Sequence, residues 1–184
     1  MIFTQTERLV IRRPRHGDAE TLLPGWMDPR MTRYTGTRPE IETFLRTLVS
    51  DMQRKDPGDT EPGGPWYQFI VERRSDGLLI GDLGVGFGVP GEHQAELGYR
   101  ILPEHQRQGY AREAVTALID YLFGAHRMHR LVAVAASLNT ASTSLLASLG
   151  FRQEGQYRKS FLCNDEWLDD SYFALLAEEW RAKG

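Results

Sequence analysis

The chain has 184 residues, of which 41% are hydrophobic and 26% charged, and its formal net charge is −3. These values are typical of a soluble globular protein, and residues 1–184 are expected to form a single domain. A negative net charge disfavours nucleic-acid binding, and no apolar run approaches the roughly 18 residues of a membrane span. The N-terminal residues lack the apolar stretch of a signal peptide, and a single cysteine allows no internal disulfide and no metal-ligand spacing. We therefore predict a cytoplasmic protein without metal, nucleic-acid or membrane partners.

The first sixty residues predict one strand and two helices. Residues 9–14 read as a first strand, which Pro14 stops. Asp18 is expected to cap a helix over residues 19–23, which the Pro-Gly pair at 24–25 should break. Pro39 should open a second helix, whose apolar stripe runs from residue 41 to residue 52.

Large side chains gather in the irregular stretch after the first predicted helix. Trp26, Met31 and Tyr34 lie there beside turn-forming residues, and Trp66 opens the next strand. Such side chains can line a substrate wall or can plug the core, and the sequence leaves both interpretations open. The Pro- and Gly-rich residues 56–65 predict a loop.

The middle of the chain predicts an antiparallel sheet. Residues 66–72 and 78–87 are strand-like and are joined by the turn signal Ser-Asp-Gly at 75–77. Residues 95–102 then form a further strand, which Pro103 ends. Three antiparallel strands are expected from this region.

A helix, a strand and a second helix follow. Apolar residues recur at helical spacing from Ala111 to Leu122, with Gly124 as a stop signal. Residues 130–136 predict a buried strand. Asn139 is a good N-cap for a helix over residues 140–149, which Gly150 ends.

The start of the first of these helices predicts an anion site. Its backbone N–H groups lack intrahelical partners, and the helix dipole favours negative charge. Gly109 and Ala111 would let a phosphate approach the main chain, while Tyr110 begins the helical turn. Donors and positive charge would come from the flanking side chains Gln106, Arg107, Gln108 and Arg112. The site suits a diphosphate, although a tight loop with solvated polar residues is the alternative.

Taken together, these segments resemble the GNAT superfamily of acetyl-CoA-dependent N-acetyltransferases, and within it the RimJ/RimL branch. The resemblance is carried by residues 6–12, Glu-Leu-Gly-Tyr at 96–99, Gln-Arg-Gln-Gly-Tyr-Ala at 106–111, Asn-x-x-Ser at 139–142 and the closing segment 167–180. It implies an α/β (α+β) GNAT fold. In this fold a mixed, mostly antiparallel twisted sheet of about seven strands is splayed at the acetyl-CoA site and flanked by about four helices. The resemblance is weakest over residues 26–65, where the family recognises its acceptors.

The resemblance also implies how acetyl-CoA is held. Main-chain groups of Ile101 and Leu102 would pair with the pantetheine arm, and the N–H groups of residues 107–112 would hold the diphosphate. Asn139 would bind or place the pantetheine arm; its alternative role is a pure helix cap.

The same resemblance implies roles in the chemistry. Glu96 would deprotonate the amine, unless it is instead paired with Arg100 or His93. The N–H of Leu102 would polarise the thioester carbonyl. Ser142 would protonate the leaving thiolate, unless it only bonds backbone at the helix start. Tyr172 is a weaker candidate for that role.

The predicted function is transfer of an acetyl group from acetyl-CoA to a primary amine by direct attack in a ternary complex. The acceptor would be a protein N-terminus, an aminoglycoside or a polyamine. A non-catalytic acyl-CoA-binding module is the alternative, and the chain is expected to be a monomer or a homodimer.

Overall fold

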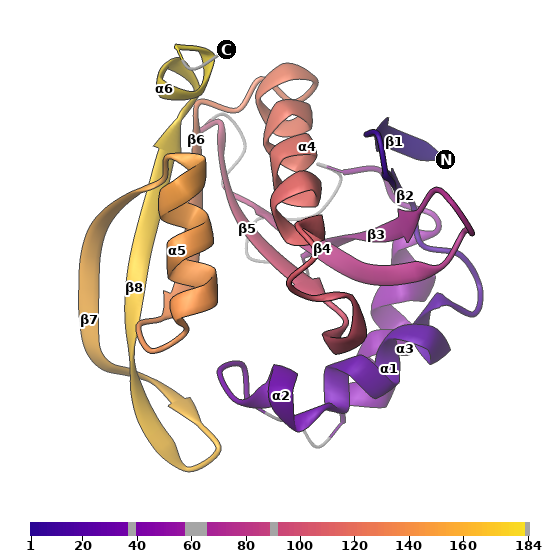
Figure 1. The fold of residues 1–184 in the computed structure, drawn as a ribbon, viewed down its shortest axis with the longest axis horizontal. Coiled ribbons are helices and arrows are strands. Elements are labelled where there is room, and N and C mark those ends of the chain that lie inside the picture. The colour runs from indigo at the N-terminus through magenta and orange to yellow at the C-terminus, as the bar shows by residue number, and fades with distance from the viewer. Residues whose placement is uncertain (37–39, 58–65, 89–91, 183–184) are drawn as a thin grey trace.

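The computed structural model of the chain describes residues 1–36, 40–57, 66–88 and 92–182. These residues form one eight-stranded sheet in the order β1-β2-β3-β4-β5-β6-β8-β7 (Figure 1). The strands are β1 (Ile2–Gln5), β2 (Leu9–Arg12), β3 (Tyr67–Arg73), β4 (Leu79–Phe87), β5 (Gln94–Ile101), β6 (Arg130–Ala136), β7 (Arg152–Cys163) and β8 (Glu166–Leu176). Neighbouring strands are antiparallel except β5 and β6, which run parallel. The sheet is therefore mixed and mostly antiparallel, as predicted.

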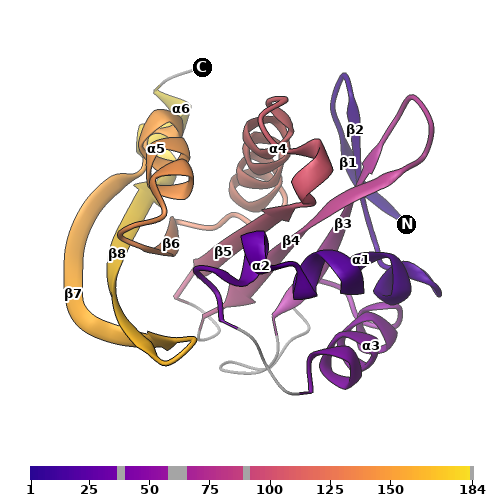
Figure 2. The same ribbon diagram turned by 60° about the horizontal axis from the view of Figure 1, so that its bottom comes forward.

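Helices cover both faces of the sheet. On one face lie α1 (Asp18–Met27), α2 (Pro29–Thr32) and α3 (Ile41–Met52), and on the other lie α4 (Tyr110–Gly124) and α5 (Thr140–Leu149) (Figure 2). A short helix, α6 (Ala177–Arg181), follows the last strand. The four helices predicted from the sequence correspond to α1, α3, α4 and α5.

Two hydrophobic cores result from this layering. Under α4 and α5, side chains such as Phe69, Leu83, Leu97 and Leu118 are at most 2% exposed. A smaller core under α1 and α3 contains Leu22, Leu45 and Ile70 among others. The strand alternation that sends Phe69 to one face and Ile70 to the other thus fixes both layers.

The sequence-based element boundaries need three corrections. The eighth strand is β1, and the two additional helices, α2 and α6, have only four and five residues. Such short segments carry too little periodicity to be detected from sequence. Pro39 and residues 58–65, for which a helix start and a loop were predicted, lie outside the described residues.

The third correction concerns α1, which continues through Pro24 instead of ending before it. Gly25 is buried against Leu102, where an added Cβ would lie 2.2 Å from Leu102 Cδ2, so this glycine permits close packing and is not a breaker. Asp18 does not cap the helix either, because Gly17 occupies the N-cap position. The carboxylate of Asp18 instead pairs with buried Arg12 at 2.7 Å.

A wedge opens between the two parallel strands. The ladder of β5 and β6 joins residues 94–96 to residues 130–132. Beyond it, β5 stays with β4 as far as Ile101, whereas β6 stays with β8 as far as Ala136. The two halves of the sheet therefore separate just after Glu96, and this separation positions the site.

Candidate active site

Main-chain groups of β5 line the wedge. The N–H of Gly88 donates to Gln94 O (3.0 Å), and the N–H of Leu102 donates to Ile80 O (2.9 Å). In an antiparallel ladder such pairs alternate, so the even-numbered residues of β5 bond to β4. The N–H and C=O groups of Leu97, Tyr99 and Ile101 consequently point to the side from which β6 has diverged.

This alternation corrects one predicted role. The N–H of Leu102 was expected to polarise a thioester carbonyl, but it is already used in the bond to Ile80 O. Residue 101 remains on the wedge side, although its carbonyl oxygen accepts from Gln106 Nε2 at 2.9 Å. The donors available to a ligand in the wedge are therefore the N–H groups of the odd-numbered residues.

The predicted anion site lies at the N-terminus of α4. A 3₁₀ turn over Pro103–His105 leads into the loop, and Gly109 occupies the N-cap with φ of 82°. A side chain is strained in that left-handed conformation, and Gly109 also leaves the first N–H groups of α4 uncovered. The structure thus has the bare helix start that the sequence predicted.

The side chains around this loop have mainly structural partners. Besides its bond to Ile101, Gln106 Nε2 contacts Met31 Sδ at 3.1 Å, and Gln108 Nε2 donates to Glu104 O at 3.2 Å. Arg112 donates to Ser148 Oγ at 2.6 Å, which ties α4 to α5. Exposed Arg107, with φ of 59°, adds a positive charge at the loop. Any anion bound there would be held mainly by main-chain N–H groups.

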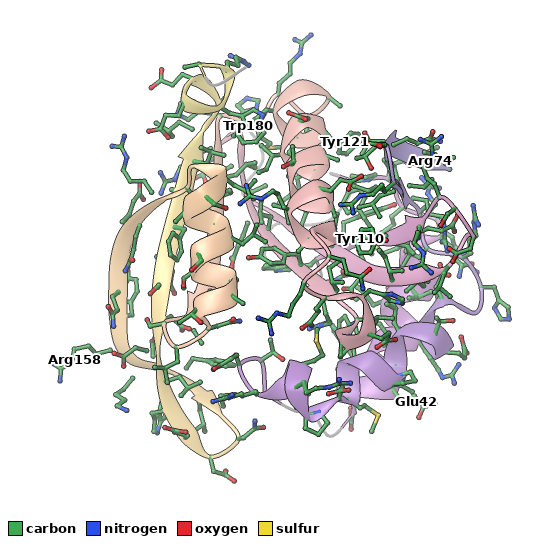
Figure 3. All side chains as sticks on the ribbon, viewed as in Figure 1. Glu42, Arg74, Tyr110, Tyr121, Arg158 and Trp180 are labelled. Atoms are coloured by element: carbon green, nitrogen blue, oxygen red, sulfur yellow. The ribbon has the colours of Figure 1, made fainter. Side chains whose placement is uncertain are left out.

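Arg8 braces the loop from the N-terminal segment, and the sequence did not indicate this role. Its Nη1 donates to Gln108 O (3.0 Å), and its guanidinium pairs with Glu113 at 2.6 Å. The same guanidinium lies 4.6 Å from the ring centroid of Tyr110. Tyr110, which is labelled in Figure 3, is the buried first residue of α4. Tyr110 therefore helps to hold Arg8 against the loop.

The start of α5 faces the wedge from the opposite half of the sheet. Asn139 Oδ1 accepts from Ser142 N at 3.3 Å, so the capping role is present. The cap uses only the amide oxygen, and the NH₂ of the same side chain is the group suited to donate to a ligand carbonyl. The two roles considered for Asn139 are therefore compatible.

Ser142 has a partner that the sequence did not suggest. Its Oγ lies 2.7 Å from the hydroxyl of Tyr99 on β5, and this bond spans the two halves of the sheet. Burial raises the pKa of Tyr99, although the bond to Ser142 acts in the opposite direction. Strand alternation could have placed Tyr99 on this face, two residues before Ile101.

Glu96 lies where the wedge begins, and its side chain lines a cavity of about 330 Å³. Trp66, Glu92 and Val132 are among the other lining residues. Within the described part of the chain Glu96 makes no ion pair, and Arg100 instead faces Asp82. Burial raises the pKa of Glu96. The result is a half-buried carboxylate that is free to accept a proton from a ligand.

Tyr172 lies on β8 and stacks edge-on against Tyr157, with ring centroids 4.3 Å apart. Burial and the nearby charges of Asp170 and Glu96 raise its pKa, so it is neutral at physiological pH. Its neighbour Phe173 is buried in the main core. Tyr172 thus lies on the same face of the sheet as Glu96, whereas Ser142 approaches from the other face.

The indole of Trp66 lies flat on a patch without side chains. Cβ atoms added at Gly84, Gly86 and Gly98 would lie 2.8–3.1 Å from its ring atoms. Because these positions belong to the adjacent strands β4 and β5, they form one glycine platform. The platform allows Trp66 to line two cavities, that of Glu96 and a second one of about 390 Å³.

The second cavity is lined by Trp26, Phe44, Trp66, Gln68 and Arg100, among others. Of the four predicted acceptor-wall residues, the structure brings Trp26 and Trp66 together here. Met31 contacts Gln106 in the loop before α4, and Tyr34 packs beside Cys163 and Leu168. The structure therefore places the two tryptophans in one cavity and Met31 and Tyr34 elsewhere, and a role of these residues in binding an acceptor stays a prediction.

Two wider properties concern the described residues as a whole. No group of three or more His, Cys, Asp or Glu side chains there is arranged to hold a metal ion. None of the helices in the described ranges is long and apolar enough to cross a membrane.

Comparisons with known proteins agree with this geometry. The profile of the acetyltransferase (GNAT) domain matches residues 8–152. The N-acetyltransferase YnaD of Bacillus subtilis is 31% identical over 175 residues, covering 95% of this chain and 97% of its own. The ribosomal protein uS5 alanine N-acetyltransferase of Escherichia coli is 36% identical over 88 residues, covering 48% of this chain and 45% of its own.

Among solved structures, spermidine N-acetyltransferase from Vibrio cholerae in complex with CoA and spermine superposes with a TM-score of 0.82. It is 22% identical, and the alignment covers 96% of this chain and 99% of that one, which supports the fold. The chain belongs to the GNAT family and is an N-acetyltransferase of the acyltransferase class. Enzymes of this fold use acetyl-CoA.

Proposed function

We propose that this enzyme transfers the acetyl group of acetyl-CoA to a primary amine by direct attack within a ternary complex. The observation that carries this proposal is the divergence of β5 and β6 at Glu96. The opening has a bare helix N-terminus beside it and a half-buried carboxylate at its edge. One substrate can enter from each face of the sheet and meet the other in the wedge.

Acetyl-CoA is held by main-chain groups in this proposal. Its diphosphate lies on the N–H groups at the start of α4, after Gly109, and its pantetheine arm runs along the odd-numbered residues of β5. The amide NH₂ of Asn139 donates to the same arm. Arg107 adds positive charge at the loop, while Arg8 keeps the loop in place.

The chemistry follows from the groups around the wedge. Glu96, directly or through a water, takes a proton from the ammonium and frees the nitrogen lone pair. The nitrogen then bonds to the acetyl carbon while an N–H of β5 polarises the carbonyl oxygen. The C–S bond breaks as the bonded nitrogen releases its second proton to solvent, and the thiolate takes a proton from the Ser142 hydroxyl, which Tyr99 and then solvent resupply. A raised pKa suits Glu96 to this task, because a base works best when its pKa approaches the ambient pH.

The proposal also concerns the chemical class of the acceptor amine. A protein N-terminal amine fits the RimJ/RimL-like segments and the partial match to the uS5 alanine N-acetyltransferase. Aminoglycosides and polyamines remain alternative acceptors. We also propose that the enzyme acts in the cytoplasm as a single domain, in monomeric or homodimeric form.

A free-thiol release assay over a panel of amines and peptides tests this function. Thiol release that depends on the acceptor and is lost in Glu96→Gln would support it. The rival function is an acyl-CoA-binding module without turnover. Acetyl-CoA binding by calorimetry, with no thiol release on any acceptor, would support that module and contradict the enzyme.

A further inference from the structure

The second cavity has a cationic end that the proposed transfer reaction does not use. Arg100 projects into it from β5, with 19% of its side chain exposed. It lies on the same strand face as Glu96, four residues further along, with Gly98 between them. Glu96 lines the first cavity, Arg100 lines the second, and Trp66 borders both, so the two side chains can address two ends of one ligand that passes over Trp66.

Arg100 is held in place by its surroundings. Its Cζ lies 3.9 Å above the ring centroid of Trp26, and its Nη1 is 3.7 Å from Asp82 Oδ2. A guanidinium held over an indole keeps N–H groups at its edge that can bind a carboxylate in a bidentate manner.

Asp82 neutralises only part of this cation, because other donors share its carboxylate. Trp26 Nε1 donates to Asp82 Oδ1 at 3.1 Å. With its amide nitrogen turned toward its acceptors, Gln68 donates to Asp82 Oδ2 at 3.2 Å. Arg100 at 3.7 Å is beyond hydrogen-bond distance, and among the described residues Asp82 is its only ionic partner. The guanidinium of Arg100 lines the cavity and is left with N–H groups that a ligand can use.

We propose that the acceptor amine carries a carboxylate, which Arg100 binds while the amine lies at Glu96. This inference rests on the proposed transfer to an amine and narrows the acceptors to amines that carry a carboxylate, which favours a short peptide over the N-terminus of a whole protein. The two residues are four positions apart on one strand, about 13 Å between Cα atoms at ~3.4 Å per residue. Subtracting about 3 Å for a hydrogen bond at each end leaves roughly 7 Å between the amine and the carboxylate. A dipeptide with a free C-terminus, or an aliphatic ω-amino acid, has this span, and its chain would lie across the indole of Trp66.

Polyamines fit this arrangement less well. Their second ammonium would approach Arg100, which is a like charge near the floor of the cavity. The aromatic faces of Trp26 and Trp66 attract cations, but Arg100 already occupies the face of Trp26. A carboxylate is therefore the charge that the described part of this cavity favours.

Two matched substrate pairs test the proposal. We expect kcat/KM for Ala-Ala to exceed that for Ala-Ala-amide by about 10- to 100-fold, as for a charge-assisted hydrogen bond. The same direction is expected for 5-aminopentanoate against pentylamine, and spermidine should be a poor acceptor. In Arg100→Gln the ratio within each pair should fall to near one, and Arg100→Lys should restore part of it.

A second variant controls for unfolding. Arg100→Gln removes the ionic partner of Asp82 and can destabilise the fold, so the double variant Asp82→Asn/Arg100→Gln is measured beside it. Both should keep the wild-type Kd for acetyl-CoA, because the main-chain groups of Arg100 bond to β4 and its side chain lies on the face of the sheet away from α4. An equal kcat/KM for Ala-Ala and its amide in the wild type would overturn the carboxylate proposal while leaving amine transfer intact.

Calorimetry decides the matter even without turnover. Ala-Ala and Ala-Ala-amide are titrated into the enzyme saturated with CoA. Tighter binding of the free acid, lost in Arg100→Gln, supports the carboxylate site even if no thiol is released and the transfer function fails. Equal binding of the two peptides overturns it.

Discussion

In the proposed site, the groups assigned to acetyl-CoA (the donor face) and the groups assigned to the amine (the acceptor face) are of different kinds. The donor face consists largely of main-chain groups, namely the helix start after Gly109 and the odd-numbered residues of β5. The acceptor face consists of side chains, and Trp26, Trp66 and Arg100 come from three separate parts of the chain. A main-chain site depends on local conformation, whereas a side-chain site depends on tertiary placement.

The two faces therefore differ in how far their side chains can change without loss of binding. Nearly any side chain can replace another around a main-chain site, provided that the conformation at Gly109 survives. On the acceptor face each substitution changes the surface that a ligand meets. The donor face therefore suits a constant substrate, and the acceptor face can specify a particular one.

The largest expected loss of activity comes from replacing Glu96, which lies at the boundary of the two faces. Glu96→Gln should lower kcat by about 10²–10⁴, because a positioned base is lost, while the Kd for acetyl-CoA stays unchanged. In the wild type, kcat/KM should rise with pH through the raised pKa of Glu96, since only the carboxylate accepts a proton. Steady-state rates from pH 4.5 to 9 check this, and persistence of the same acidic limb in Glu96→Gln would exclude Glu96 as the base.

The next effect should be confined to the donor face. Gly109→Val forces a β-branched residue into a φ of 82° and brings its Cβ 3.3 Å from Arg8 Nη2. Strain of about 1–3 kcal/mol will move the loop, so acetyl-CoA binding should weaken at least ~10-fold by calorimetry. Gly17→Val is the matched control, because Gly17 has φ of 92° at the start of α1, with open space around it. It should cost stability without changing the Kd for acetyl-CoA, and equal loss of binding in both variants would show that global strain is the cause.

A smaller effect is expected at the hydroxyl pair that joins the halves of the sheet. Ser142→Ala should lower kcat about tenfold, less than loss of a full general acid, because a thiol of pKa ~8.5 leaves readily as a thiolate. Tyr99→Phe should have a similar or smaller effect. Single-turnover rates measure both, with exposed Ser144→Ala on the same helix as a control. An unchanged rate in Ser142→Ala would assign the proton to another donor, and Tyr172→Phe would then be tested.

The smallest predicted effect is on the acceptor face alone. An added methyl in Gly86→Ala would lie 2.8 Å from Trp66 Nε1, so the indole must shift. The KM for the acceptor should rise about two- to fivefold, which corresponds to ~0.5–1 kcal/mol, with the Kd for acetyl-CoA unchanged. Gly124→Ala, which meets open space at the end of α4, is the control. A change in acetyl-CoA affinity in Gly86→Ala would mean that the two faces are coupled.

The same contrast explains how much could be predicted from the sequence. The donor elements were predicted because their signals are local: Gly109 before an apolar helical repeat, and Asn139 three residues before Ser142. The role assigned to the N–H of Leu102 conflicts with the bond of that N–H to Ile80 O, because the strand register that sets this bond cannot be read from the sequence.

The acceptor face was harder because its contacts are nonlocal. Trp66 and Gly98 are 32 positions apart in the printed sequence, and the Arg100–Asp82–Trp26 cluster joins two strands and a helix. Glycines at 84, 86 and 98 on adjacent antiparallel strands were a usable signal. Such a run of missing side chains on one sheet face predicts that a large ring covers it.

The glycine platform also gives the enzyme an intrinsic fluorescent probe of ligand binding. Trp26 and Trp66 both border the second cavity, whereas Trp167 and Trp180 lie on β8 and α6. Intrinsic fluorescence of the two cavity tryptophans will therefore change when a ligand displaces water from their rings. Acceptor binding can then be followed in real time on the unlabelled protein, with Trp167→Phe/Trp180→Phe lowering the background.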